Sequence, residues 1–190
     1  MRNICSLTSF SLAIALLISG CASETAATKS VSSPNGHKLN REAEATLETL
    51  YAEAPSARSL VEKSKGVLIF SDVVKAGFIG GADFGKGVLK KGRKVDGYYN
   101  LVTASVGFQA GVQTYDYVLV FMNKSALDAL DALDGFQVGI GPSIVIADQG
   151  VAGSISTSSA RADVYAFIFD QKGIMGAVNL EGSKITRIDP

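Results

Sequence analysis

The residues of this sequence that could carry acid–base chemistry are almost all carboxylates. The single histidine of the chain, His37, lies in the segment predicted below to be a tether, outside the domain. A Ser-His-Asp triad or a zinc site needs a histidine inside the fold. Three of the aspartates follow one another at helical spacing, which indicates a solvated helix face. No enzymatic activity, metal or cofactor is therefore predicted, and a hydrolase built on a carboxylate pair is the alternative. The candidate carboxylates are Asp72, Asp83, Asp96, Asp116, Asp128, Asp131, Asp134, Asp148, Asp163 and Asp170.

A glycine-rich segment at residues 80–87 comes close to a phosphate-binding loop. Its last position is Gly87, where such a loop carries the Ser or Thr that holds magnesium. The residues that follow predict a strand and a turn, so no helix N-terminus faces a phosphate. Turn glycines are the better explanation of this segment.

Cys21 ends a short apolar leader that begins with a basic residue, Arg2. The apolar run at residues 4–18 is shorter than the ~20 residues that cross a bilayer, and it is typical of a secretory signal. The segment Leu17-Ile18-Ser19-Gly20-Cys21 resembles the lipobox of bacterial lipoproteins. We therefore expect a signal peptide over 1–20, acylation of Cys21 with palmitate-type chains, and a lipidated tether over 21–39. Ala22 follows the cysteine, which favours sorting to the outer membrane of the cell envelope.

Charge is balanced overall but unevenly distributed. The chain has 18 basic and 18 acidic residues, so no net charge attracts it to nucleic acid. A basic cluster on a predicted hairpin could contact anionic headgroups, at roughly 1 kcal/mol per charge. The alternative is a set of ordinary lysines that protect a sheet edge. The predicted headgroup-binding residues are Lys75, Lys86, Lys90, Lys91, Arg93 and Lys94.

Hydrophobic periodicity predicts an α+β domain over 40–190. Helical spacing over 39–54 indicates an amphipathic helix, and Pro55-Ser56 begins a second one. Residues 102–113 alternate between apolar and polar, as expected of a half-buried strand, and Val118–Met122 predicts a strand buried on both faces. Asn123 caps one inserted helix, which Gly135 ends. Glycines within strands favour a mostly antiparallel, compact curved sheet or barrel-like sandwich.

From residue 65 onward the sequence resembles the SYLF domain family. The resemblance lies in stretches that match in order. Where the family usually has a tryptophan-like or aromatic segment, this chain has Gly97-Tyr98-Tyr99-Asn100, without tryptophan. The matching stretches are 65–70, 74–81, 85–89, 104–111, 118–123, 172–176 and 180–183.

The resemblance implies a lipid-binding module. Eukaryotic members bind phosphoinositides with the help of an N-terminal amphipathic helix, and a fungal branch also binds actin. In this chain the corresponding elements are the basic cluster and the helix over 40–54. Actin binding is not carried over, because an exported bacterial protein meets no actin. We expect a non-catalytic, membrane-anchored lipoprotein whose domain binds lipid. The alternative is a structural or protein-partner-binding envelope lipoprotein with no lipid contact beyond its acyl anchor.

Overall fold

The computed structural model describes residues 33–77, 80–106, 111–131, 135–138, 140–147, 162–173 and 182–190. The predicted signal peptide, the lipidation site at Cys21 and most of the tether lie outside these residues. The predicted strand at residues 174–180 also lies outside them.

The first described helix, α2 (Pro34–Glu53), begins earlier than the sequence predicts. Ser33 caps it, since its hydroxyl accepts a hydrogen bond of 2.9 Å from the Gly36 N–H. Pro34 fits the first turn because its missing N–H would have no partner there. Residues 34–39 therefore belong to the folded domain and not to the tether. The second helix, α3 (Pro55–Lys63), follows the break at Ala54 as predicted.

Eight strands form one sheet, in the order β5-β8-β3-β2-β1-β4-β7-β6. Every pairing is antiparallel except the parallel pair β6–β7. The strands are β1 (Gly66–Gly77), β2 (Gly80–Lys91), β3 (Lys94–Val106), β4 (Gly111–Phe121), β5 (Phe136–Gln137), β6 (Ile144–Ala147), β7 (Val164–Gly173) and β8 (Lys184–Ile188).

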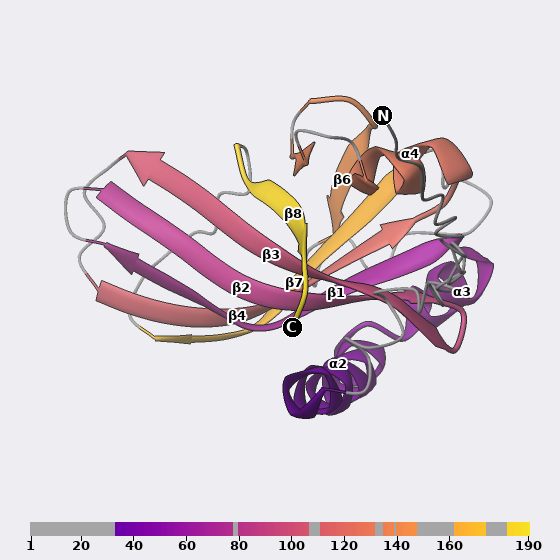
Figure 1. The fold of residues 1–190 in the computed structure, drawn as a ribbon, viewed down its shortest axis with the longest axis horizontal. Coiled ribbons are helices and arrows are strands. Elements are labelled where there is room, and N and C mark those ends of the chain that lie inside the picture. The colour runs from indigo at the N-terminus through magenta and orange to yellow at the C-terminus, as the bar shows by residue number, and fades with distance from the viewer. Residues whose placement is uncertain are drawn as a thin grey trace, which may run out of the picture.

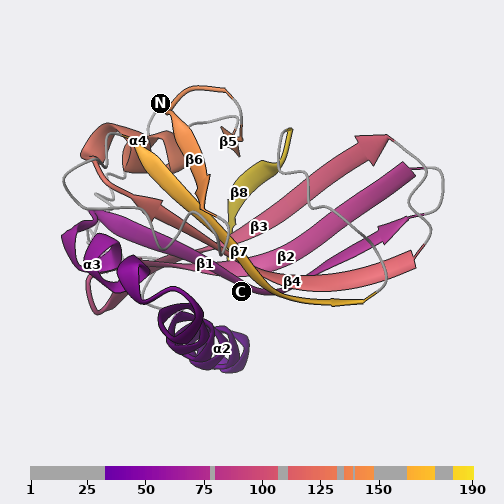
Figure 2. The same ribbon diagram turned by 180° about the vertical axis from the view of Figure 1, so that it is seen from behind.

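The sheet curls so that its two edge strands, β5 and β6, lie on the same side (Figure 1). The inner face of the curl holds one apolar cluster, which includes Leu68, Phe70 and Leu119. The outer face carries α2 and α3 over a second cluster, which includes Leu47, Ile69 and Val118 (Figure 2). The predicted α+β fold with a curved, mostly antiparallel sheet is confirmed.

The inserted helix also forms as predicted. The Asn123 side chain accepts a hydrogen bond of 2.8 Å from the Ala126 N–H at the start of α4 (Lys124–Asp128). A 3-10 turn, η1 (Ala129–Asp131), continues it. Leu127 and Leu130 pack into the inner cluster. Among the described helices, none has both the length and the apolar composition needed to cross a bilayer.

The alternating segment at 102–113 differs from its prediction in two ways. Strand β3 ends at Val106 and β4 begins at Gly111, so two strands share the pattern. The polar side chains Thr103 and Gln113 are buried, whereas Val102 and Val112 are exposed. The apolar half of the pattern therefore faces outward, because on this part of the sheet the inner face buries polar groups.

Candidate functional site

The six basic residues predicted to bind headgroups do not form one patch. Lys75 is 1% exposed and lies on the inner face, so its ammonium group is removed from any membrane surface. Lys90 is also buried and forms an ion pair with Glu44 of α2. Lys91 forms an ion pair of 3.0 Å with Asp96. Lys75 and Lys90 are therefore buried within the fold, and Lys90 and Lys91 are paired with neighbouring carboxylates.

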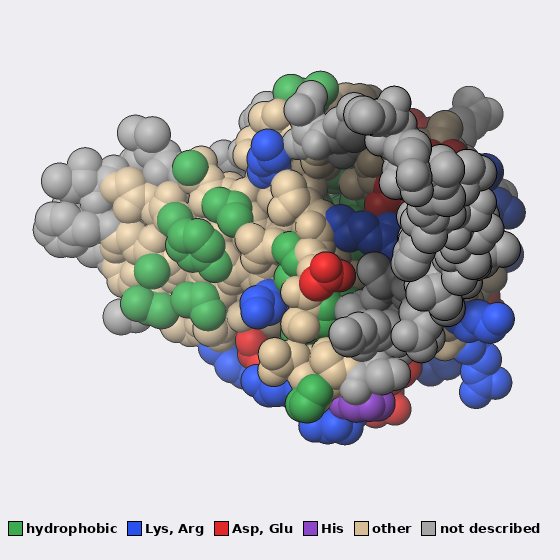
Figure 3. All heavy atoms as spheres, viewed as in Figure 1, with side chains coloured by type: hydrophobic (Ala, Val, Ile, Leu, Met, Phe, Trp, Pro, Cys, Tyr) green, Lys and Arg blue, Asp and Glu red, His purple; other side chains and the backbone are tan. Residues whose placement is uncertain are grey.

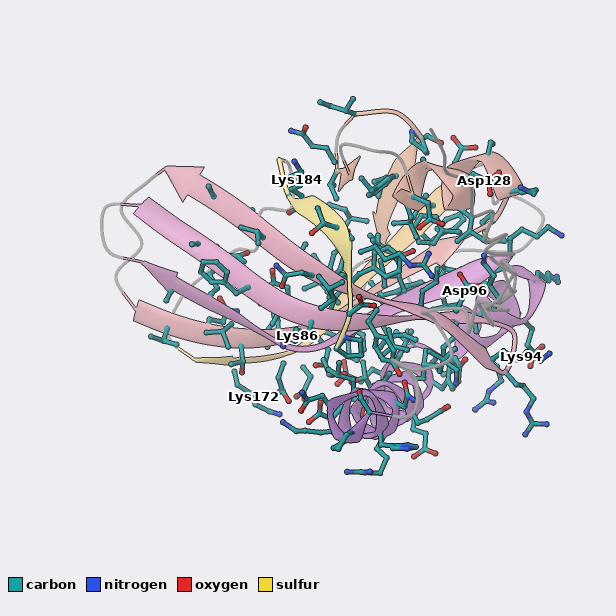
Figure 4. All side chains as sticks on the ribbon, viewed as in Figure 1. Lys86, Lys94, Asp96, Asp128, Lys172 and Lys184 are labelled. Atoms are coloured by element: carbon teal, nitrogen blue, oxygen red, sulfur yellow. The ribbon has the colours of Figure 1, made fainter. Side chains whose placement is uncertain are left out.

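The other three predicted cations are exposed but separated. Arg93 and Lys94 lie at the β2–β3 turn, where Gly92 adopts a φ of 59°. Lys86 lies on the middle of β2, paired in register with Asn100. Figure 4 shows Lys86 and Lys94 on opposite sides of α2. Within the described part of the chain, no ion pair engages Lys86, Arg93 or Lys94.

Lys75 belongs to a polar row that crosses the inner face. In the register of the sheet it lies between Gln113 of β4 and Asp83 of β2, and Asp83 is followed by Thr103 of β3. The Tyr115 hydroxyl donates a hydrogen bond of 2.9 Å to Asp83 Oδ2. Burial raises the pKa of Asp83, while the hydrogen bond from Tyr115 and the charge of Lys75 oppose that change. This row is a buried polar layer, far from the solvent that bathes the outer face.

The outer face beyond α2 is open and apolar. One cross-strand row there contains Val74 of β1, Phe84 of β2 and Val102 of β3. The next row contains Val112 of β4 and three alanines, which are Ala76, Ala82 and Ala104. Phe84 is 54% exposed and Val112 is 57% exposed. Figure 3 shows a group of hydrophobic side chains on this face, over the ends of the long strands. We call these seven residues the outer apolar patch.

Three lysines surround the outer apolar patch. Lys172 of β7 pairs in register with Thr114, and Lys184 of β8 pairs with Val102, so each stands at one end of the Val74–Phe84–Val102 row. Lys86 flanks the row on β2. Figure 4 shows these three lysines over the same half of the sheet. Lys172 and Lys184 are not among the residues predicted from the sequence, because only the strand order and register bring β7 and β8 to opposite ends of one row.

Carboxylates offset part of this positive charge. Asp170 forms an ion pair of 2.7 Å with Lys172. Asp116 is buried on the outer face, where it accepts hydrogen bonds from the Asp72 N–H (2.9 Å) and the Thr46 hydroxyl (3.3 Å). Burial raises the pKa of Asp116. Among the described residues, the lysines of this face without an ion pair are therefore Lys86 and Lys184, on the β2–β8 side.

The two buried aspartates of the described residues do not form a pair. Asp83 and Asp116 are the buried aspartates, and they lie on opposite faces of the sheet. Asp163 binds the Ser143 N–H and hydroxyl, and Asp131 binds Arg187. Over the described ranges, no group of three histidine, cysteine or acidic residues is arranged to hold a metal ion.

Comparison with known families agrees with the sheet and its sequence motifs. Residues 102–189, from β3 through β8, match the SYLF domain model described as Las17-binding protein actin regulator. Residues 102–189 are therefore similar to the SYLF family, in agreement with the resemblance seen in the sequence. The outer apolar patch draws Val102, Ala104 and Val112 from the matched segment, and its other residues precede that segment.

A curated relative shares more of the chain. It is an SH3 domain-containing protein of Schizosaccharomyces pombe, 28% identical over 145 residues. The match covers 72% of this chain and 33% of the relative, so this chain corresponds to about a third of that protein. The relative therefore carries further sequence outside the shared segment.

Proposed function

We propose that this chain is a non-catalytic, membrane-anchored lipoprotein whose SYLF domain binds the headgroups of anionic lipids. Acyl chains on Cys21 would hold it to the cell envelope, on the outer membrane. The observation that carries the proposal is the placement of Lys86, Lys172 and Lys184 around one open face of the sheet (Figure 4). Strand β2 supplies one of these charges, and the C-terminal strands β7 and β8 supply the other two.

The energetics fit a weak, salt-sensitive contact. Each lysine near an anionic surface contributes roughly 1 kcal/mol, and screening limits the attraction to about 10 Å at 0.1 M salt. The two or more acyl chains of a lipoprotein already give stable anchoring. Headgroup binding by the domain would then serve a second membrane or a choice among lipids, rather than localisation.

The structure changes the expected role of the amphipathic helix. Ala43, Leu47 and Leu50 form the apolar stripe of α2, and all three are buried against the outer face. Thr46 further ties α2 to β1 through a contact of 2.8 Å with the Ser71 hydroxyl. In the folded domain this stripe is not free to enter a bilayer, so the proposal rests on the sheet face instead.

A two-vesicle assay tests the headgroup proposal. The full chain is reconstituted in phosphatidylcholine vesicles, which are mixed with labelled vesicles of phosphatidylcholine alone or with phosphatidylglycerol. We expect recruitment of the anionic vesicles at low salt and its loss at high salt. The double variant Lys86→Gln/Lys184→Gln should weaken recruitment, while the matched variant Arg93→Gln/Lys94→Gln should weaken it less. Equal recruitment of neutral and anionic vesicles would rule out headgroup binding.

The family description favours a second function, the binding of a protein partner. The matched model is described as an actin regulator and the curated relative carries an SH3 domain. An envelope protein that binds the SYLF domain would fit this function. Isolation of a stoichiometric partner by cross-linking in intact cells, together with no recruitment of anionic vesicles, would favour it over lipid binding.

A further inference from the structure

We propose that the outer apolar patch enters the interfacial layer of an anionic bilayer, with Phe84 as its central anchor. This inference rests on the proposed lipid binding and specifies its mode: apolar insertion between lysines, rather than headgroup contact alone. The proposed binding partner is an anionic lipid bilayer.

The exposed apolar residues of the patch form one contiguous group. Register places Phe84 directly between Val74 and Val102, and the alanine row lies beside it. Single exposed apolar residues are common on soluble proteins, whereas a contiguous group rimmed by polar residues marks an interaction site. The small side chains of Ala76, Ala82 and Ala104 leave Phe84 and Val112 as the projecting members.

The orientation of the strands exposes the apolar side chains of the patch. On β2, β3 and β4 the polar members Asp83, Thr103 and Gln113 face inward, and their apolar neighbours face outward. This orientation exposes apolar surface to water, which costs about 25 cal/mol of free energy for each Å². A bilayer interface would remove that area from water without reversing the buried polar row.

Positively charged lysines lie at the margin of the outer apolar patch. Lys184 and Lys172 stand at the two ends of the row, and their long apolar stems let the ammonium groups reach headgroups while the row between them sits deeper. Lys86 and Lys184 form no ion pair with any described residue, so the β2–β8 side should meet the anionic headgroups first.

The shape of the sheet favours a bilayer over a second copy of the chain. Register places the patch on the face of the sheet that carries α2, and α2 lies on the outside of the curl (Figures 1 and 2). Two outward-curved faces touch over a limited area, whereas a stable protein interface buries about 800 Å² on each partner. A fluid bilayer adapts to the curved surface.

The anchor is compatible with this orientation. Helix α2 begins at Pro34 on the same side of the sheet as the patch. The residues between Cys21 and Ser33 reach about 40 Å at full extension. An acylated Cys21 could therefore hold the patch against the anchoring membrane as well as present it to a second one.

A tryptophan reporter provides the test, because the chain has no tryptophan. Phe84→Trp in the full chain, held in phosphatidylcholine vesicles, is mixed with anionic vesicles whose acyl chains are brominated. We expect a blue shift of the emission and its quenching by the brominated chains. Ile140→Trp is the matched control, since Ile140 is an exposed apolar residue outside the patch and 66% exposed; its emission should not change.

A second pair of variants separates the two proposals. Phe84→Asp should lower the affinity for anionic vesicles about tenfold, while Ile140→Asp should leave it unchanged. Insertion would be overturned, and headgroup binding left intact, by two results together. Phe84→Trp would be recruited to anionic vesicles without a blue shift of its emission, and Phe84→Asp would bind them with full affinity. Absence of recruitment by the unmodified chain would overturn both. The unmodified chain could instead form a dimer in lipid-free detergent solution that the Phe84→Asp substitution dissociates. That result, together with no quenching by brominated lipid, would show that the patch binds a second copy of the chain.

Discussion

Asp83 and Phe84 are consecutive residues of β2 that face opposite sides of the sheet, with Asp83 1% exposed and Phe84 54% exposed. The usual arrangement would bury the phenyl ring and solvate the carboxylate. Here the carboxylate lies beside Lys75 in the register of the sheet and accepts a hydrogen bond from Tyr115. The pair thus links the two unusual features of this domain, a polar inner layer and an apolar outer patch.

Tyr115 and Tyr117 give a matched test of the inner layer. Both rings are buried on β4, but the Tyr117 hydroxyl has no hydrogen-bond partner in the described part of the chain. Tyr117→Phe should raise the free energy of unfolding by about 1 kcal/mol, because a buried unsatisfied group is removed. Tyr115→Phe should lower it by about the same amount, because Asp83 loses a donor. Urea unfolding measures both, and a loss of stability in Tyr117→Phe would show that its hydroxyl is satisfied.

The pH dependence of stability tests the environment of Asp83. Burial raises the pKa of its carboxyl above 3.8, so in acid the native state holds a proton that the unfolded state releases. The contribution of Asp83 to the free energy of unfolding therefore falls as the pH rises from 3.8 through the native value, and it stays low above that value. Asp83→Asn lacks this titration.

The variant minus wild-type difference in unfolding free energy should therefore increase between pH 4 and pH 7. Urea titrations at several pH values measure this difference. Asp116, whose pKa is also raised, is present in both proteins and cancels. A difference that does not change with pH would contradict the raised pKa of Asp83.

Asp170 should restrain lipid binding, because it neutralises Lys172 in an ion pair of 2.7 Å. Asp170→Asn frees one positive charge, and asparagine tolerates the positive φ of 50° found there. We expect stronger recruitment of anionic vesicles by about fivefold at low salt, which corresponds to roughly 1 kcal/mol per charge. Asp128→Asn is the control, since Asp128 pairs with Lys124 on α4, away from the patch. Equal increases in both variants would mean that only net charge matters.

Cys21 should carry the acyl chains. In cells supplied with labelled palmitate, the wild-type chain should incorporate the label and Cys21→Ser should not. Cys5→Ser is the internal control and should label normally, because Cys5 lies in the predicted signal peptide. Label that persists in Cys21→Ser would place the lipid elsewhere.

The curled sheet itself was predictable because local signals agree with one another. The Val118–Met122 run predicts a strand buried on both faces, and Val118–Phe121 are fully buried. Asn123 predicts a helix start, and its side chain caps α4. The sequence predicts the start of α2 too late, because Pro34 and Gly36 are typical of a flexible tether, whereas the Ser33 cap makes them part of the first turn of a helix.

The candidate site was predicted less well, because lysines close in sequence need not share a surface. Lys75 and Lys86 lie on neighbouring strands of one hairpin, yet Lys75 faces inward and Lys86 outward. A bulge between Phe70 and Val74 shifts the register of β1, and a bulge reverses which side chains face the core. Such a shift is not readable from the alternation of residue types.

The sequence by itself determined the kinds of element, the basic hairpin and the resemblance to the SYLF family, since these depend on local spacing and residue type. Only the tertiary structure decided which half of the alternating pattern faces water. It also decided that Lys172 and Lys184 stand at the two ends of the row centred on Phe84. These relationships depend on strand order, register and the curl of the sheet, which arise from contacts between segments distant in the chain.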